Sequence, residues 1–314
     1  MDLSIVFATY NRDKILKRTL QSFALLDFGN LSAEIIVVDN ACRAETKTLV
    51  TGFDHKLPIA YLDQSKPGKN AAINKGLSYS KGQLIVFTDD DILADEQWLL
   101  ELTRAAVEFP EANVFGGAIL PDWPDTGDKD FEKILDLEDN FIKVAYAITD
   151  TDFKRGVIDP QLIWGANMAV RRTAFEQHNL SFNESVGPNK NKYIMGSETD
   201  ILKRLSDLGH KAVMVPEAFV YHQIRVEQLS MEWIRLRATN MGKTMVANQQ
   251  VVFGRIVIGG VPLYLYKNLL KHSLLLLLDS IFSKKSMHSI KQNSNISKIK
   301  GVIFQLKLSE SGGK

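Results

Sequence analysis

Leu84-Ile85-Val86-Phe87-Thr88-Asp89-Asp90-Asp91 is the stretch that decides the fold, because it sets three carboxylates directly after an apolar run typical of a buried strand. Neighbouring carboxylates raise one another's pKa unless a positive charge neutralises them. A hard divalent cation with oxygen ligands would supply that charge, and a bound diphosphate would share it. The alternative is a strand that ends in a solvated acidic turn and caps the next helix. The triplet alone leaves both interpretations open.

Other strand patterns earlier in the chain also end in polar residues. Residues 3–8 are almost continuously apolar and lead to Thr9, and residues 34–38 lead to Asp39. Residues 58–62 predict a third strand, and residues 69–79 predict a helix before the aspartate strand. Strands of this kind alternating with helices predict an α/β fold, whose mostly parallel central sheet has helices on both faces. Ligands of such sheets bind at the carboxyl ends of the strands, so Thr9, Asp39 and the aspartates should share one crevice.

The second half of the pattern is less regular. Residues 121–160 have weak periodicity and predict a partly helical insertion, whereas Gly209 predicts the C-terminal end of a helix over residues 199–208. Further elements are predicted as a helix over residues 96–109 and strands over residues 114–119, 164–170, 212–215 and 219–221.

Charge divides the chain unevenly. Residues 251–314 hold ten basic and two acidic residues, a net charge of +8, which leaves −7 for residues 1–250 because the whole chain carries +1. The basic residues alternate with leucine, isoleucine and tyrosine, a pattern that argues against nucleic-acid binding. Lysines and Asp279 interrupt residues 255–282, so no uncharged stretch of about 20 residues is available to span a bilayer. We expect a helical, basic C-terminal tail that lies on an anionic membrane surface. Packing on the catalytic domain and an oligomer interface are the alternatives.

The flanking residues of this tail, Lys284, Lys285 and Lys291, strengthen its basic character. The single cysteine, Cys42, excludes an intramolecular disulfide and fits a reducing compartment. A strand pattern begins at Leu3 without a basic or cleavable apolar leader. These features predict a cytoplasmic protein, peripheral on the cytoplasmic face of the inner membrane if the tail binds lipid.

Four segments in order carry a family resemblance. They are Ser4-Ile5-Val6-Phe7-Ala8-Thr9-Tyr10-Asn11-Arg12, Val37-Val38-Asp39-Asn40, Gly68-Lys69-Asn70-Ala71-Ala72-Ile73-Asn74-Lys75-Gly76 and the triplet, which matches an Asp-x-Asp motif. Over roughly residues 3–221 the chain resembles family 2 glycosyltransferases, which have the Rossmann-like GT-A fold. The resemblance implies inverting transfer of a sugar from a nucleotide diphosphate sugar, UDP-linked, to a hydroxyl of a glycan or lipid-linked acceptor, as in cell-surface polysaccharide synthesis. It implies a catalytic domain over residues 1–250, divided into a nucleotide-binding half (1–120) and an acceptor-binding half (121–250), followed by the tail.

The resemblance also implies site residues. Asp89 is expected at the ribose or sugar, Asp91 and His222 at a manganese or magnesium ion, and Asp90 is expected to be the most replaceable of the triplet. The family often has arginine where this chain has Ile73, so a basic contact to the nucleotide is either missing or supplied by Lys66 or Lys69. The nucleotide-sugar-binding set is Thr9, Tyr10, Asn11, Arg12, Asp39, Lys69, Asn74, Asp89, Asp90, Trp164 and Gly165.

The catalytic base is sought in Gly196-Ser197-Glu198-Thr199-Asp200-Ile201-Leu202-Lys203-Arg204-Leu205, which resembles the family's Glu-Asp motif. Aligned on its last residues, the motif puts Glu198 where the family's base stands, and Asp200 is the second choice. Such a base deprotonates the acceptor hydroxyl opposite the leaving group. The alternative is a helix start in which Ser197 and Asp200 form a capping box and the acids oppose the helix dipole.

The segment from Trp164 to Arg172 resembles the family's sugar and acceptor pocket, where Trp164 could stack on a sugar face. Packing roles for Trp164 and Gly165 are the alternative, Asn167 is the weakest match, and Arg171 and Arg172 are expected to be solvated.

Two other functions are alternatives for this pattern. A nucleotidyltransferase would carry a glycine-rich, arginine-containing phosphate loop after the first strand, and Thr9-Tyr10-Asn11-Arg12 lacks those glycines. A glycan- or nucleotide-binding scaffold without catalysis remains the alternative that only binding and turnover can test.

Overall fold

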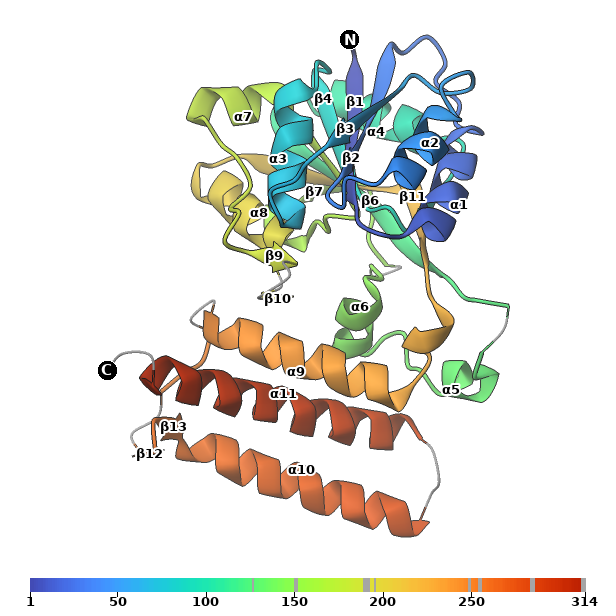
Figure 1. The fold of residues 1–314 in the computed structure, drawn as a ribbon. Coiled ribbons are helices and arrows are strands. Elements are labelled where there is room, and N and C mark those ends of the chain that lie inside the picture. The colour runs from blue at the N-terminus through green and yellow to red at the C-terminus, as the bar shows by residue number, and fades with distance from the viewer. Residues whose placement is uncertain are drawn as a thin grey trace. The chain divides into compact units, whose positions relative to one another are not determined.

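The computed structural model describes residues 1–125, 127–149, 152–188, 193–194, 196–247, 250–253, 256–282 and 286–311. Arg255, Lys284, Lys285 and Lys314, which contribute to the predicted basic tail, lie outside these ranges. The chain forms two compact units (Figure 1). The sheet unit comprises residues 1–122, 147–192 and 196–223, and the helical unit comprises residues 123–146, 193–195 and 224–314. The predicted boundary after residue 250 therefore falls inside the helical unit, and the nucleotide and acceptor halves stay predictions.

A nine-stranded sheet of described residues organises the sheet unit. Its parallel half is formed by β3 (Ile59–Asp63), β2 (Ala33–Asp39), β1 (Leu3–Thr9) and β4 (Leu84–Thr88) in that spatial order. The order continues through β8 (Asn167–Arg171), which is antiparallel to both β4 and β6 (Ala112–Asp122). Then β11 (Lys211–Gln223) runs parallel to β6, and β5 (Ile92–Ala94) and β7 (Gly156–Ile158) pair with it antiparallel. The predicted mostly parallel α/β sheet is confirmed.

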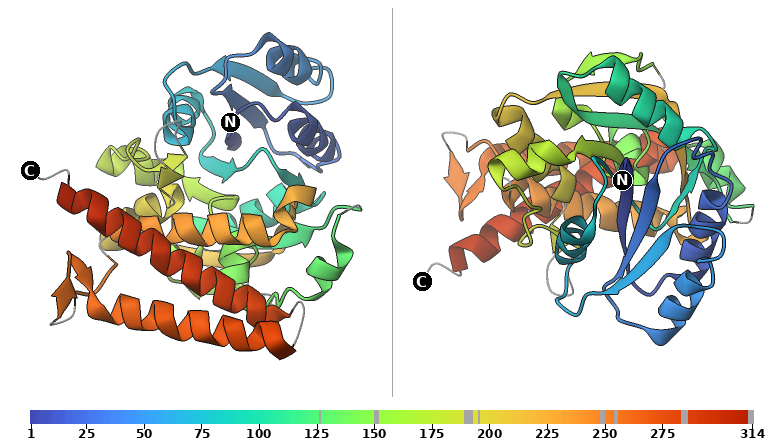
Figure 2. Two further views of the ribbon diagram at one scale, coloured as in Figure 1. Left: turned by 60° about the horizontal axis from the view of Figure 1, so that its bottom comes forward. Right: turned by 90° about the horizontal axis from the view of Figure 1, so that it is seen from above.

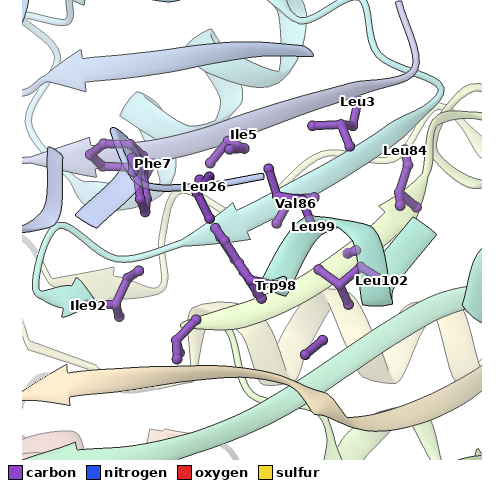
Figure 3. Close-up of a cluster of buried hydrophobic side chains, with 14 of the residues drawn as sticks. Leu3, Ile5, Phe7, Leu26, Leu84, Val86, Ile92, Trp98, Leu99 and Leu102 are labelled. Atoms are coloured by element: carbon purple, nitrogen blue, oxygen red, sulfur yellow. The ribbon is translucent and has the colours of Figure 1, made fainter. Parts of the chain in front are cut away.

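Both faces of this sheet are buried, because alternate residues of each strand pack against different helices. Ile5 and Phe7 of β1 belong to a core with α1 (Asp13–Phe23) and α4 (Trp98–Glu108). Figure 3 shows this core with labelled residues of β1 and α4. Val6 of the same strand belongs to a core with α3 (Lys69–Tyr79), α7 (Arg172–His178) and α8 (Ser197–Asp207). Phe23 of α1 contacts Phe7 edge-on and stacks on Trp98, with both pairs of ring centroids 5.8 Å apart. Two hydrophobic cores, one on each face of the sheet, therefore fix the positions of its strands.

The predicted strands over residues 212–215 and 219–221 form one strand, β11, with an irregularity between Val215 and Val220. Pro216 cannot donate to the ladder and explains the break. Opposite it, a Cβ on Gly117 would lie 1.7 Å from the Ala218 carbonyl oxygen, so only glycine admits this close backbone approach. Beyond the irregularity the register resumes and places His222 opposite both Pro121 and Ile92.

The remaining elements fall close to their predicted places. The insertion is partly helical as predicted, with α5 (Lys129–Lys133) and α6 (Asn140–Tyr146), and α2 (Ala44–Thr51) follows β2. The predicted strand over residues 164–170 begins only at Asn167, after the 3₁₀ turn η1 (Pro160–Leu162). Two short strands are β9 (Gly187–Pro188) in the sheet unit and β10 (Tyr193–Ile194) in the helical unit.

Three long helices build most of the helical unit. They are α9 (Met231–Ala247), α10 (Leu263–Phe282) and α11 (Met287–Ser311), with α11 between the other two (Figures 1 and 2). Glycines bring α9 and α11 together, since a Cβ on Gly242 would lie 2.0 Å from the Lys298 carbonyl oxygen and one on Gly301 would lie 2.1 Å from that of Thr239. The turn η2 (Val226–Gln228) and the hairpin β12 (Val257–Ile258) and β13 (Val261–Pro262) complete the unit. None of its described helices is both long and apolar enough to cross a membrane.

Candidate active site

The site begins where β1 and β4 end side by side. These strands are parallel neighbours, so their carboxyl ends bring Thr9 next to the aspartate triplet. The Thr9 hydroxyl donates to Oδ2 of Asp90 at 2.7 Å. After a left-handed residue at Asn11, with φ 53°, the chain turns and Arg12 caps the start of α1. Its Nη1 donates at 2.9 Å both to Oδ1 of Asp90 and to Oδ2 of Asp91. Of the predicted convergence of Thr9, Asp39 and the triplet, the structure shows the contact between Thr9 and the triplet, and Arg12 joins them.

Asp90 is an internal anchor of this site. Its residue is only 4% exposed, and its backbone carbonyl accepts from the Thr19 hydroxyl at 2.8 Å. Burial, and after it the charge of Asp91, raises the pKa of Asp90 to about 6, against the opposing effects of Arg12 and Thr9. The interpretation of the triplet as a solvated turn is wrong, because Asp90 and Asp91 are buried. That Asp90 is its most replaceable member stays a prediction, and the contacts with Thr9 and Arg12 argue against it.

Asp91 and His222, the two residues predicted to bind the metal, lie side by side. Nε2 of His222 lies 3.6 Å from Oδ2 of Asp91, and both side chains are buried. One carboxylate oxygen and one imidazole nitrogen at this spacing fit a single manganese or magnesium ion. No group of three or more candidate ligands occurs among the described residues, so diphosphate oxygens and water would have to complete the shell. Arg12 meanwhile shares the Asp91 carboxylate and supplies positive charge beside it.

Lys69 joins the triplet to the candidate base. It is the first residue of α3, and Gly68 before it has φ 127°, a value that favours glycine. Its Nζ lies 2.6 Å from Oδ1 of Asp89 and 2.7 Å from Oε1 of Glu198. Burial by itself lowers the pKa of Lys69, but the two carboxylates outweigh it and raise the pKa. Asp89 and Glu198, 109 positions apart in the sequence, thus share one cation.

Gly165 gives Glu198 the space for this contact. A Cβ at position 165 would lie 1.9 Å from Cγ of Glu198 and 2.6 Å from its Oε1. Asp200, the second candidate for the base, pairs instead with Arg204 at 2.8 Å, one helical turn away. The predicted capping box is absent, because α8 begins after Gly196 with no side-chain cap. Geometry therefore favours Glu198.

Asp39 lies at a strand end as predicted, but its carboxylate already accepts hydrogen bonds from neighbouring residues. It is fully buried and accepts from the backbone N–H of Ala41 and of Arg43, both at 2.8 Å, and from the Tyr61 hydroxyl at 3.0 Å. Burial, with the bonds to Asp63 and Asp39, raises the pKa of Tyr61. Asp39 thus holds the loop after β2, and a contact with a nucleotide base stays a prediction.

The other predicted residues divide into two groups. Tyr10 and Asn11 are exposed beside Arg12, and Trp164 is half-buried against the core. Asn74 instead exchanges hydrogen bonds with the backbone of Phe182 and donates to Glu184, so the structure does not bring it into the cluster. Lys66 also pairs with Glu184, so of the two candidate lysines Lys69 is the one that contacts the triplet.

Comparison with known proteins identifies the family. The model of "Glycosyl transferase family 2" matches residues 4–178, more than half of the chain. The chain belongs to glycosyl transferase family 2. A glucosyl-dolichyl phosphate glucuronosyltransferase of Haloferax volcanii is 20% identical to this glycosyltransferase over 76% of its chain and 74% of the relative.

Solved structures show the shared GT-A fold. TarS 1–349 of S. aureus in complex with UDP has a TM-score of 0.56 and 14% identity, covering 100% of the glycosyltransferase and 92% of TarS 1–349. The mannosyltransferase PcManGT of Pyrobaculum calidifontis, in complex with GDP-Man and Mn²⁺, has a TM-score of 0.60 and 14% identity. That match covers 97% of the glycosyltransferase and 86% of the mannosyltransferase.

Sequence reasoning missed several residues that support the site of the glycosyltransferase. Gln223 donates from its backbone to the Asp91 carbonyl at 2.8 Å and from its side chain to Thr19 at 3.0 Å, which fixes the triplet from β11. Asn167, expected at the pocket, is buried and bonds Trp98 and the carbonyls of Ala118 and Ala218. No local pattern marks these contacts, because each joins distant segments.

Arg171 and Arg172 correct another expectation. Both were expected to be solvated, but Arg171 donates to the carbonyls of Ala112 and Ala106, and Arg172 donates to that of Gly82. Both arginines therefore have a structural role, because they pair backbone carbonyls of neighbouring segments.

Proposed function

We propose that this glycosyltransferase is a metal-dependent inverting enzyme that moves a sugar from a nucleoside diphosphate sugar to a hydroxyl of a glycan or lipid-linked acceptor. The observation that carries the proposal is the cluster at the strand ends. There Lys69 joins Asp89 to Glu198, while Arg12 joins Asp90 to Asp91, which lies beside His222. A donor diphosphate would meet cations, and an acceptor hydroxyl would meet a carboxylate.

Different residues of the site have different roles in this reaction. Asp91 and His222 would hold a manganese or magnesium ion, which when bound stabilises the negative charge of the departing diphosphate. Arg12 adds positive charge on the same side of the site. Glu198 accepts the proton of the acceptor hydroxyl while the hydroxyl oxygen attacks the anomeric carbon. The attack comes from the side opposite the leaving group, so the configuration of that carbon is inverted. Lys69 and Gly165 determine where the Glu198 carboxylate lies.

The donor and acceptor classes rest on similarity. A UDP-linked donor follows from the family resemblance and is supported by the UDP complex of TarS, whereas PcManGT carries GDP-Man. The Haloferax relative, whose name describes transfer to glucosyl-dolichyl phosphate, supports a lipid-linked acceptor. Because donor choice depends on pocket shape, both UDP and GDP sugars belong in the test.

The test measures release of nucleoside diphosphate from UDP and GDP sugars in Mn²⁺, with slow donor hydrolysis as a readout that needs no acceptor. We expect EDTA and Asp91→Ala to abolish release and Glu198→Gln to slow it strongly. Asp130→Ala, an exposed carboxylate in α5, is the matched control and should retain full activity. Full activity in EDTA and in Asp91→Ala would refute the metal role. Absence of release from every donor would favour the scaffold without catalysis.

A further inference from the structure

The outward face of α10 carries an unusual row of exposed leucines. Leu270, Leu274, Leu277 and Leu278 are 63%, 53%, 60% and 52% exposed. Their spacing of four, three and one residues puts them on one stripe of the helix. The opposite face is used internally, since Leu265 is buried in a core with Val261, Ile299, Val302 and Leu306. The leucine stripe, defined by these four exposed residues, is therefore not needed to hold α10 on α11.

The charges beside the leucine stripe have one sign. Lys267 and Lys271 are exposed and lie one turn before Leu270 and Leu274. The acid of this helix, Asp279, is turned inward, with its side chain 18% exposed and Oδ1 3.5 Å from Nε2 of His288 on α11. Every exposed residue described in α10 is therefore apolar, neutral or basic. A surface that combines leucines with flanking lysines complements a negatively charged apolar boundary.

We propose that the leucine stripe and its two lysines bind an anionic lipid surface, with α10 lying in the plane of the interface. Apolar side chains of such helices enter the boundary between headgroups and acyl chains, while lysines meet anionic headgroups. The preceding hairpin adds apolar surface, since Val257 and Ile258 are also exposed. A second copy of the chain is a poorer occupant, because it would bring the same lysines against these lysines. The proposal concerns the helical unit and is independent of the donor site.

The test is co-sedimentation of the full chain with vesicles of phosphatidylglycerol and phosphatidylcholine in equal amounts, compared with phosphatidylcholine alone. Wild type should sediment with the anionic vesicles and be released by salt. Leu270→Gln with Leu274→Gln should weaken partition by about tenfold per leucine. Lys267→Gln with Lys271→Gln should weaken it by about fivefold per lysine.

Control substitutions distinguish binding through the leucine stripe from nonspecific hydrophobic adsorption. Leu25→Gln with Val107→Gln removes two exposed apolar residues of the sheet unit and should leave sedimentation unchanged. Leu277→Gln with Leu278→Gln should reproduce the loss, and neither stripe pair should shift Tm, because the side chains are exposed. The proposal is overturned if wild type stays in the supernatant, or if both stripe pairs sediment like wild type. A stable dimer in solution that the stripe substitutions dissociate would also overturn it.

Discussion

Gly165→Ala should disable the enzyme by moving Glu198, its proposed catalytic base. A methyl group at this position would lie 1.9 Å from Cγ and 2.4 Å from Cδ of Glu198. Carbon atoms pack at about 3.5–4.0 Å, so the carboxylate must move by roughly 1.5–2 Å. The 2.7 Å contact with Lys69 cannot survive that shift. Since a misplacement of about 1 Å can cost about 100-fold in rate, we expect kcat to fall by at least about that factor.

Stability should change little, because the Glu198 side chain is 25% exposed and can turn toward solvent. We expect a loss near the lower end of overpacking costs, about 1 kcal/mol, measured by urea unfolding. The activity assay is release of nucleoside diphosphate under saturating donor.

A double-mutant comparison identifies the cause. Glu198→Ala should itself slow turnover by about 10²–10⁴-fold, as expected for loss of a general base. In that background Gly165→Ala should have no further effect, because the side chain that its methyl group meets is gone. Wild-type turnover in Gly165→Ala would refute the reasoning. A further large loss in the double variant would show that Gly165 acts on the ligand and not through Glu198.

Three further substitutions test other parts of the account. Arg12→Gln removes the cation that shares the Asp91 carboxylate, so Mn²⁺ alone should bind about tenfold tighter by electron paramagnetic resonance; weaker binding would show that Arg12 does not compete with the metal. Asn167→Ala removes the hydrogen-bond partner of the Trp98 indole N–H and of two carbonyls, and should lower the free energy of unfolding in urea by about 3 kcal/mol. A loss of less than about 1 kcal/mol would show that water replaces the amide. In the folded chain, burial and then the charge of His178 lower the pKa of His210 below its ordinary value of 6.5. The unfolded chain therefore binds this proton at a higher pH, and the stability that depends on neutral His210 is lost as pH falls below about 6.5. His210→Gln should flatten the pH dependence of unfolding between pH 7 and 5, and an unchanged slope would contradict this.

Local pattern was sufficient for the elements that carry the site. The apolar run before Asp89 and the helix beginning at Lys69 are specified by neighbours in sequence, and the helix has its predicted bounds, Lys69–Tyr79. Buried strands with polar ends on a parallel sheet also predicted that Thr9 lies beside the triplet. These inferences succeeded because they need only strand order and direction.

The interactions within the site could not be predicted in the same way. Lys69 and Glu198 are 129 positions apart, and their contact depends on how α3 and α8 pack on one face of the sheet. Asp90 looked replaceable because sequence does not reveal burial, and Asn74 looked like a ligand contact because its loop partner near Phe182 is distant.

The central claim is that the triplet, with His222, forms a metal-dependent donor site, and calorimetric titration of UDP and GDP tests it most directly. In wild type we expect one nucleotide to bind at least about tenfold tighter in Mn²⁺ than in EDTA, because an ion held by Asp91 and His222 would stabilise the negative charge of the diphosphate. In Asp91→Ala and His222→Ala this difference should disappear. Equal affinity with and without the metal in wild type would contradict the account.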